Sequence, residues 1–154
     1  MPAMGRAALG WMMPIAIMVV GCSGVGTPDR GDGQHPISAA EVEANAQVHL
    51  PPGTVLLSTT YQGFQDWHLT AVFRILGSAL PGFLRDGGFG QPTPGLRAVT
   101  NADRPDSDTW KPDTATTIAG VDQTNNPVGK VYRKLLLDLS RAGEVTAYLV
   151  AFTT

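Results

Sequence analysis

Hydrophobic and polar residues alternate along WHLTAVFRIL, residues 67–76. Successive side chains of a strand point to opposite faces, so the segment would separate into two sets. One set is apolar and comprises Trp67, Leu69, Ala71, Phe73 and Ile75. The other is mixed and comprises His68, Thr70, Val72 and Arg74. The pattern predicts a half-buried strand.

Two further apolar segments, residues 131–139 and 144–152, flank the short connection 140–143. A four-residue loop that ends in glycine, here Gly143, is typical of a β-hairpin. Both faces of the segment 144–152 are largely apolar. We therefore expect this strand to be central and covered on both sides.

The first part of the chain predicts one helix and one strand. In residues 37–47, Ser38 and Glu41 have the spacing of a capping box, and Val42 and Ala46 would form the apolar face of the helix. Residues 54–61 are rich in β-branched side chains and follow a Pro-Pro-Gly turn, which favours a strand.

A second short helix is expected over residues 78–86, where Ser78 would cap the N-terminus and two glycines follow. From residue 87 to residue 129 no apolar period is sustained, and five prolines interrupt the segment. We expect a long Gly/Pro-rich loop there, with one short strand near residues 116–121. The sequence thus predicts a single α+β domain over residues 37–154, a small antiparallel sheet of about four strands with one or two short helices.

Composition limits the classes of function. The chain has 154 residues, 43% of them hydrophobic, and a formal net charge of −2. Such a chain suits one folded domain. It has no basic excess, so the electrostatic attraction that drives non-specific nucleic-acid binding is missing.

The N-terminal segment, residues 1–21, is typical of a signal peptide. Arg6 precedes an apolar run over residues 7–20 that is shorter than the ~20 residues of a membrane-spanning helix. The sole cysteine, Cys22, follows directly and has no partner for an intrachain disulfide. Residues 23–36 are polar and glycine-rich, as expected of a flexible tether.

The stretch Val19-Val20-Gly21-Cys22 resembles the bacterial lipobox. This resemblance implies that cleavage occurs between Gly21 and Cys22 and that the Cys22 sulfur carries a diacylglyceryl group. Residues 22–36 would then be the lipidated N-terminus and tether of a protein on the extracytoplasmic face of the cell membrane. The alternatives are an uncleaved signal-anchor helix and a catalytic or metal-binding role for the thiol.

The lipobox, the tether and the arginine bias among basic residues are similar to those of small actinobacterial lipoproteins. The run QDWHLTAVF and the closing YLVAFTT are also similar to uncharacterised members of that group. This resemblance implies a location and a compact fold, but no activity.

Candidate chemistry begins with Asp66 and His68. On a strand these side chains would share a face with Arg74, and a carboxylate can orient an imidazole as a general base or metal ligand. No nucleophile elbow accompanies them. The alternative is an exposed polar strand face.

The sequence gives little support for a metal site or a cofactor site. The three histidines have no ligand spacing, and the loop with Asp103, Asp106, Asp108 and Asp113 lacks the glycine and glutamate of an EF-hand. The sequence also contains no phosphate-binding or dinucleotide-binding glycine motif, so it predicts no cofactor.

Trp110 and Arg133 are each open to two interpretations. Trp110 would either serve as a binding anchor on the loop or fold back and fix the loop to the core. Arg133 interrupts the apolar face of the segment 131–139. It would either lie at the exposed end of the strand or pair with a carboxylate such as Asp66, and we expect the pairing.

Three functions remain open. The first is a non-enzymatic envelope domain that binds a protein, a glycan or a small molecule, with Asp66, His68, Arg74, Trp110 and Arg133 as candidate contacts. The second is a small hydrolase or metal-dependent enzyme that uses Asp66 and His68. The third is a structural subunit of a larger envelope complex. The membrane, through lipidated Cys22, is an expected partner in all three cases.

Overall fold

The computed structural model describes residues 33–63, 65–104 and 107–154. The proposed signal peptide, Gly21, Cys22 and most of the tether lie outside these residues. The elements in chain order are α1 (Ala39–Ala46), β1 (Val55–Gly63), β2 (Trp67–Leu76), α2 (Leu80–Asp86), β3 (Thr93–Pro94), β4 (Ile118–Asp122), β5 (Tyr132–Asp138) and β6 (Glu144–Phe152). Within the described residues, no helix is long and apolar enough to cross a bilayer.

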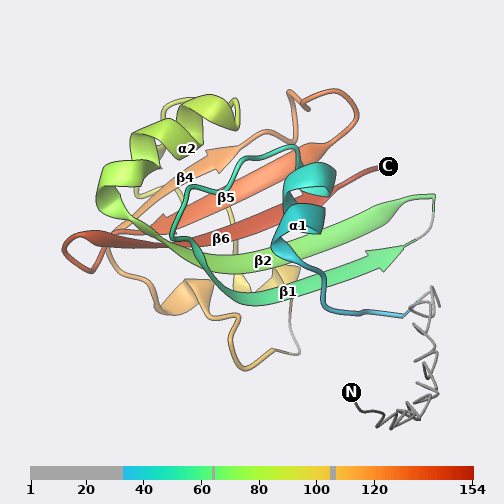
Figure 1. The fold of residues 1–154 in the computed structure, drawn as a ribbon, viewed down its shortest axis with the longest axis horizontal. Helices are drawn as coiled ribbons and strands as arrows, with labels where there is room; N and C mark the ends of the chain where they lie inside the picture. Colours follow the sequence, from blue (N-terminus) through green and yellow to red (C-terminus); the bar gives the residue numbers. More distant parts are fainter. Residues whose placement is uncertain (1–32, 64, 105–106) are drawn as a thin grey trace, which may run out of the picture.

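The strands form one antiparallel sheet in the order β1-β2-β6-β5-β4-β3. An α+β fold is therefore correct, but the expected count of about four strands is wrong. The sheet has six strands, because β4 forms near the expected place and a two-residue strand, β3, pairs with it. The central position of β6 is as predicted (Figure 1).

Both helices pack on one face of the sheet (Figure 1). The predicted apolar set of β2 faces them, and Val42, Ala46 and Phe83 from the helices complete this core. The capping box of α1 forms as expected, since the Glu41 amide donates to Ser38 Oγ over 3.3 Å and the Ser38 amide donates to Glu41 Oε2 over 2.8 Å. Ser78 does not cap α2, which begins after a 3₁₀ turn over Gly77–Ala79.

The segment between β3 and β4 covers part of the opposite face. Its Val99 and Trp110 pack on Val72, Leu136 and Tyr148 of the sheet and form a second core with them. Trp110 is 2% exposed, donates from Nε1 to the Thr100 carbonyl over 2.9 Å and meets the Tyr148 ring edge-on. Residues 95–104 and 107–117 of the expected loop thus form the cover of a second core.

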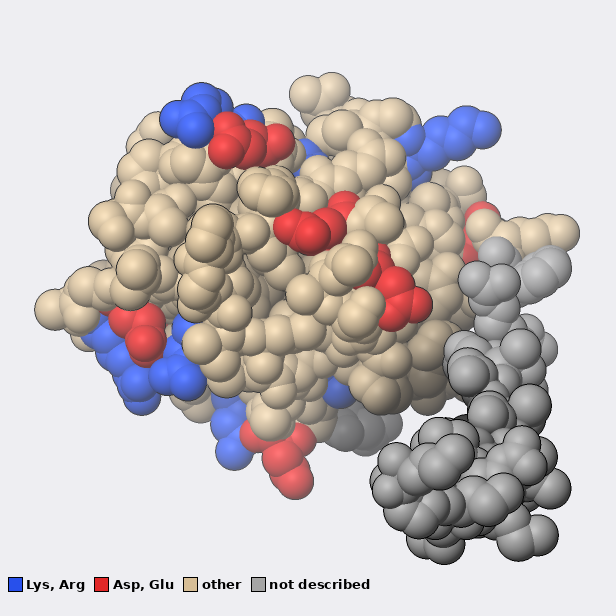
Figure 2. Space-filling view, in the orientation of Figure 1, with Lys and Arg blue, Asp and Glu red and all other residues tan. Residues whose placement is uncertain are grey.

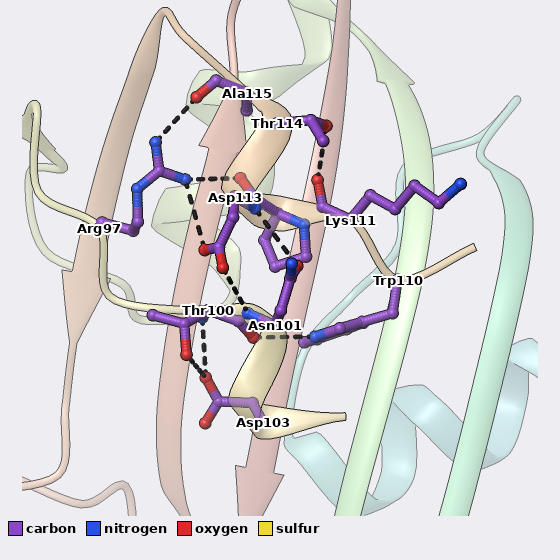
Figure 3. Close-up of polar contacts among 10 residues, drawn as sticks. Arg97, Thr100, Asn101, Asp103, Trp110, Lys111, Asp113, Thr114 and Ala115 are labelled. Atoms are coloured by element: carbon purple, nitrogen blue, oxygen red, sulfur yellow. Dashed lines mark hydrogen bonds and ion pairs between the residues drawn. The ribbon is translucent and has the colours of Figure 1, made fainter. Parts of the chain in front are cut away.

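Side-chain hydrogen bonds hold this cover in shape (Figure 3). Arg97 donates to the carbonyls of Pro112 and Ala115, and Asp103 accepts from the Thr100 amide over 2.8 Å. Lys134 of β5 reaches the Asp103 carboxylate over 3.0 Å. These contacts therefore hold the cover together and attach it to the sheet.

The prediction that Arg133 pairs with a carboxylate is wrong. The Arg133 side chain is fully buried under α1 on the helical face of the sheet, and no carboxylate pairs with it among the described residues. The guanidinium donates to the carbonyls of Ala46 and Gln47 at the end of α1 and to Gln123 Oε1. A cation at a helix C-terminus interacts favourably with the unpaired carbonyls and with the helix dipole. The carbonyls of α1 thus take the place of the expected acidic partner.

Candidate functional site

A groove of about 520 Å³ lies on the helical face, between α2 and the edge formed by β3 and β4. Leu80, Pro81 and Leu84 of α2 form one wall, and Phe89, Pro92 and Pro94 form the other part of the lining. The floor is made of Ala119, Leu137 and Leu139. Its volume falls within the usual range for small-molecule sites, and nine of its twelve lining residues are apolar.

Local sequence explains why the groove stays open. Phe83 points into the core and packs against Phe73 and Phe89, with ring centroids 5.6 and 5.5 Å apart. Leu80 and Leu84, on another side of the same short helix, are only half-buried. Ala119 supplies a methyl group where a larger side chain would fill the floor. The groove is the space that α2 leaves uncovered beside the sheet edge.

β3 is held against β4 by a close backbone approach. Thr93 pairs with Gly120, and a Cβ on Gly120 would lie 2.3 Å from the Leu96 carbonyl oxygen. No side chain fits there, so glycine is required for the chain to pass. This contact positions Pro92 and Pro94 at the rim of the groove.

Among the described residues, Arg85 is the one charged residue that lines the groove. Its Nε donates to Asp86 Oδ1 over 2.9 Å, and its side chain is 75% exposed. Gln91 adds an amide. The lining residues provide no carboxylate, imidazole or thiol, so the groove has contacts for binding and no general base.

A smaller hollow of about 340 Å³ contains Asp66 and His68 at the other end of the sheet. Among the hydrogen bonds of the described residues, none joins these two side chains. The His68 ring instead stacks on Phe152, with centroids 6.3 Å apart, and Phe152 stacks on Tyr132. Burial lowers the pKa of His68; Asp103 opposes this shift and Lys134 adds to it.

The five candidate contacts predicted from the sequence do not converge. Asp66 and His68 share one hollow, whereas Arg74, at the other end of β2, lies 3.4 Å from Glu144. Arg133 is buried on the opposite face and Trp110 is buried in the second core. The structure brings only Asp66 and His68 together.

The groove was not predicted from the sequence. Leu80 and Leu84 lie within the predicted helix over residues 78–86, but nothing in the sequence pattern placed them beside Pro92 or Leu139. Leu139 directly follows β5 and remains 36% exposed. Its exposure depends on the packing of distant segments, so no pattern within one segment indicated the groove.

The described residues contain no group of three or more His, Cys, Asp or Glu side chains placed to hold a metal. Asp103 and Asp113 of the acidic loop take part in the hydrogen bonds of Figure 3, and Asp106 lies outside the described residues. The acidic side chains seen here therefore stabilise the loop.

Comparisons with protein-family models, with curated proteins and with solved structures find no match to this chain.

Proposed function

We propose that the protein is a lipid-anchored domain of the cell envelope that binds a small apolar ligand in the groove beside α2 and catalyses no reaction. The groove, about 520 Å³ and lined mainly by carbon, is the observation that carries the binding part of the proposal. The lipobox-like stretch that ends at Cys22 supports the anchor.

The groove favours binding over catalysis because of what its lining lacks. A hydrolytic site needs a nucleophile or an activated water, a base and a stabilised oxyanion. In the part of the chain that the structure describes, the only ionisable side chain of the lining is Arg85, which stays protonated at neutral pH. An apolar ligand would gain from the removal of carbon surface from water, about 25 cal/mol per Å².

The anchor is tested by the intact mass of the protein extracted from the membranes of its native host. We expect a chain that starts at Cys22 with a diacylglyceryl-sized addition. An uncleaved chain with an unmodified cysteine would contradict the anchor and leave the groove proposal unaffected.

The binding site is tested by photo-labelling of the full chain with an uncharged aliphatic diazirine. We expect label on the peptides that line the groove, and its loss in Ala119→Phe, which fills the floor. Ala44→Phe adds the same ring to an exposed position of α1 and is the matched control. Label spread evenly over the surface, unchanged by Ala119→Phe, would refute the groove as a binding site.

A further inference from the structure

We propose that the ligand is a single-chain amphiphile with a carboxylate head, of the long-chain fatty acid class, whose alkyl chain lies in the groove and whose head is held by Arg85. This inference rests on the proposed function, since it names the class of ligand for the same groove.

The walls select the alkyl part. Leucine, proline and phenylalanine side chains form both sides of the groove, and the floor offers no hydrogen-bond donor except backbone already paired between β4 and β5. A polar chain, such as a glycan, would leave its hydroxyls unpaired there. An aliphatic chain has no polar groups to satisfy.

Arg85 selects the head. Asp86 accepts only from its Nε, and both terminal nitrogens of Arg85 have no hydrogen-bond partner among the described residues. A Cβ built on Gly82 would lie 3.7 Å from Nη2, which shows that the guanidinium folds back along α2. Two parallel N–H groups of a guanidinium fit the two oxygens of a carboxylate.

A second positive charge lies behind the wall. The Arg133 guanidinium is 4.4 Å from the centroid of the Phe89 ring, and Phe89 lines the groove. Arg133 is fully buried, and within the described ranges its partners are neutral oxygens and its Nη2 is unpaired. Since the lining contains no carboxylate, the charges around the groove favour an anionic head over a cationic one.

The exposed surface is consistent with this arrangement. In the view of Figure 2, uncharged residues cover most of the helical face, and Lys and Arg atoms lie toward its margins. Basic and acidic atoms lie next to each other over the corner that α2 occupies in Figure 1. The neighbouring carboxylate reduces the attraction of Arg85 for an anion. We therefore expect a moderate preference for an anionic head group over an uncharged one.

The test compares two probes that differ only in the head group. Dodecanoate and dodecanol, each with a diazirine at the end of the chain, are added at pH 8 to the full chain in nanodiscs of zwitterionic lipid. Labelled peptides are identified by mass spectrometry in the wild type, in Arg85→Gln and in Arg141→Gln. Arg141 is 72% exposed, also pairs with an acidic side chain and does not line the groove, so it is the matched control.

We expect the carboxylate-to-alcohol labelling ratio of the groove to be about twofold to fivefold higher in the wild type than in Arg85→Gln, the range of an exposed ion pair. Arg141→Gln should keep the ratio of the wild type. Comparing ratios between variants cancels the different partition of the two probes into lipid.

Three outcomes would overturn the inference. An equal ratio in the wild type and in Arg85→Gln, with the groove still labelled by the alcohol, refutes the carboxylate head and leaves apolar binding in place. No groove label from either probe refutes the proposed binding function as well. Groove peptides crosslinked to a second copy of the chain, with both probes excluded, would make the groove a contact between protomers.

Discussion

Arg133 offers the sharpest test of how the helical layer is held. Its guanidinium is fully buried, has no carboxylate partner in residues 33–63, 65–104 and 107–154, and donates to two carbonyls at the end of α1. We predict that Arg133→Ala lowers the free energy of unfolding strongly and releases α1 from the sheet before the sheet itself opens.

The magnitude follows from three contributions. Truncation of a large buried side chain costs about 2–5 kcal/mol. The Ala46 carbonyl, which is buried, loses a partner, and an unsatisfied buried acceptor costs about 1–3 kcal/mol. Removal of a buried, unpaired charge offsets part of this loss. We expect about 3–5 kcal/mol for Arg133→Ala and about 1–3 kcal/mol for Arg133→Met, which keeps most of the volume.

The assay is urea unfolding followed by circular dichroism, combined with amide hydrogen exchange. The exchange of the α1 amides should accelerate more than that of β6 in both variants. Arg141→Ala, at an exposed position, should change the free energy of unfolding by less than about 0.5 kcal/mol.

Two results would contradict this role of Arg133. A loss below about 1 kcal/mol in Arg133→Ala would show that the guanidinium contributes little beyond the cost of its own burial. A larger loss with unchanged relative protection of α1 would show that Arg133 acts through general packing and not through the helix end.

Three further predictions concern the cover, the sheet edge and acid stability. Trp110→Ala should cost about 3–5 kcal/mol in urea unfolding, because the indole is 2% exposed and its N–H is paired, and Trp110→Phe should cost less. Gly120→Ala should destabilise the protein and loosen the Thr93–Leu96 segment, seen as faster amide exchange there; Gly90→Ala, where a Cβ meets nothing within 4 Å, should not. Burial lowers the pKa of His68 in the folded state, so the unfolded state binds its proton at higher pH and stability should fall as pH drops below about 6.5. His68→Gln should reduce that slope in unfolding curves between pH 7.5 and pH 5.5, and an unchanged slope would contradict the role given to its burial.

Much of the fold could be predicted because its signals are local. The alternation over residues 67–76 placed each side chain of β2 on its correct face, and the capping box located the start of α1. Both patterns depend only on residues within one element. The hairpin of β5 and β6 was predictable for the same reason.

The cover and the groove depend on contacts between distant residues. Arg97 donates to the backbone carbonyls of Pro112 and Ala115. Contacts to backbone carbonyls produce no periodic pattern of side chains in the sequence. The groove combines α2, β3, β4 and the end of β5, so no single segment reveals it. For Arg133, the expected pairing with a carboxylate is wrong, because the sequence could not show that the end of α1 would lie nearer than a carboxylate.

The position of β6 has a consequence for how the protein folds. It is the last strand in chain order, yet it lies at the centre of the sheet between β2 and β5. During synthesis or export from the N-terminus, β2 has no partner on that side until residues 144–152 arrive, and its pairing with β6 then closes a large loop. High contact order of this kind slows folding. Until then, the hairpin of β1 and β2 keeps one apolar edge exposed. A chaperone or an aggregating neighbour would act at this stage of folding.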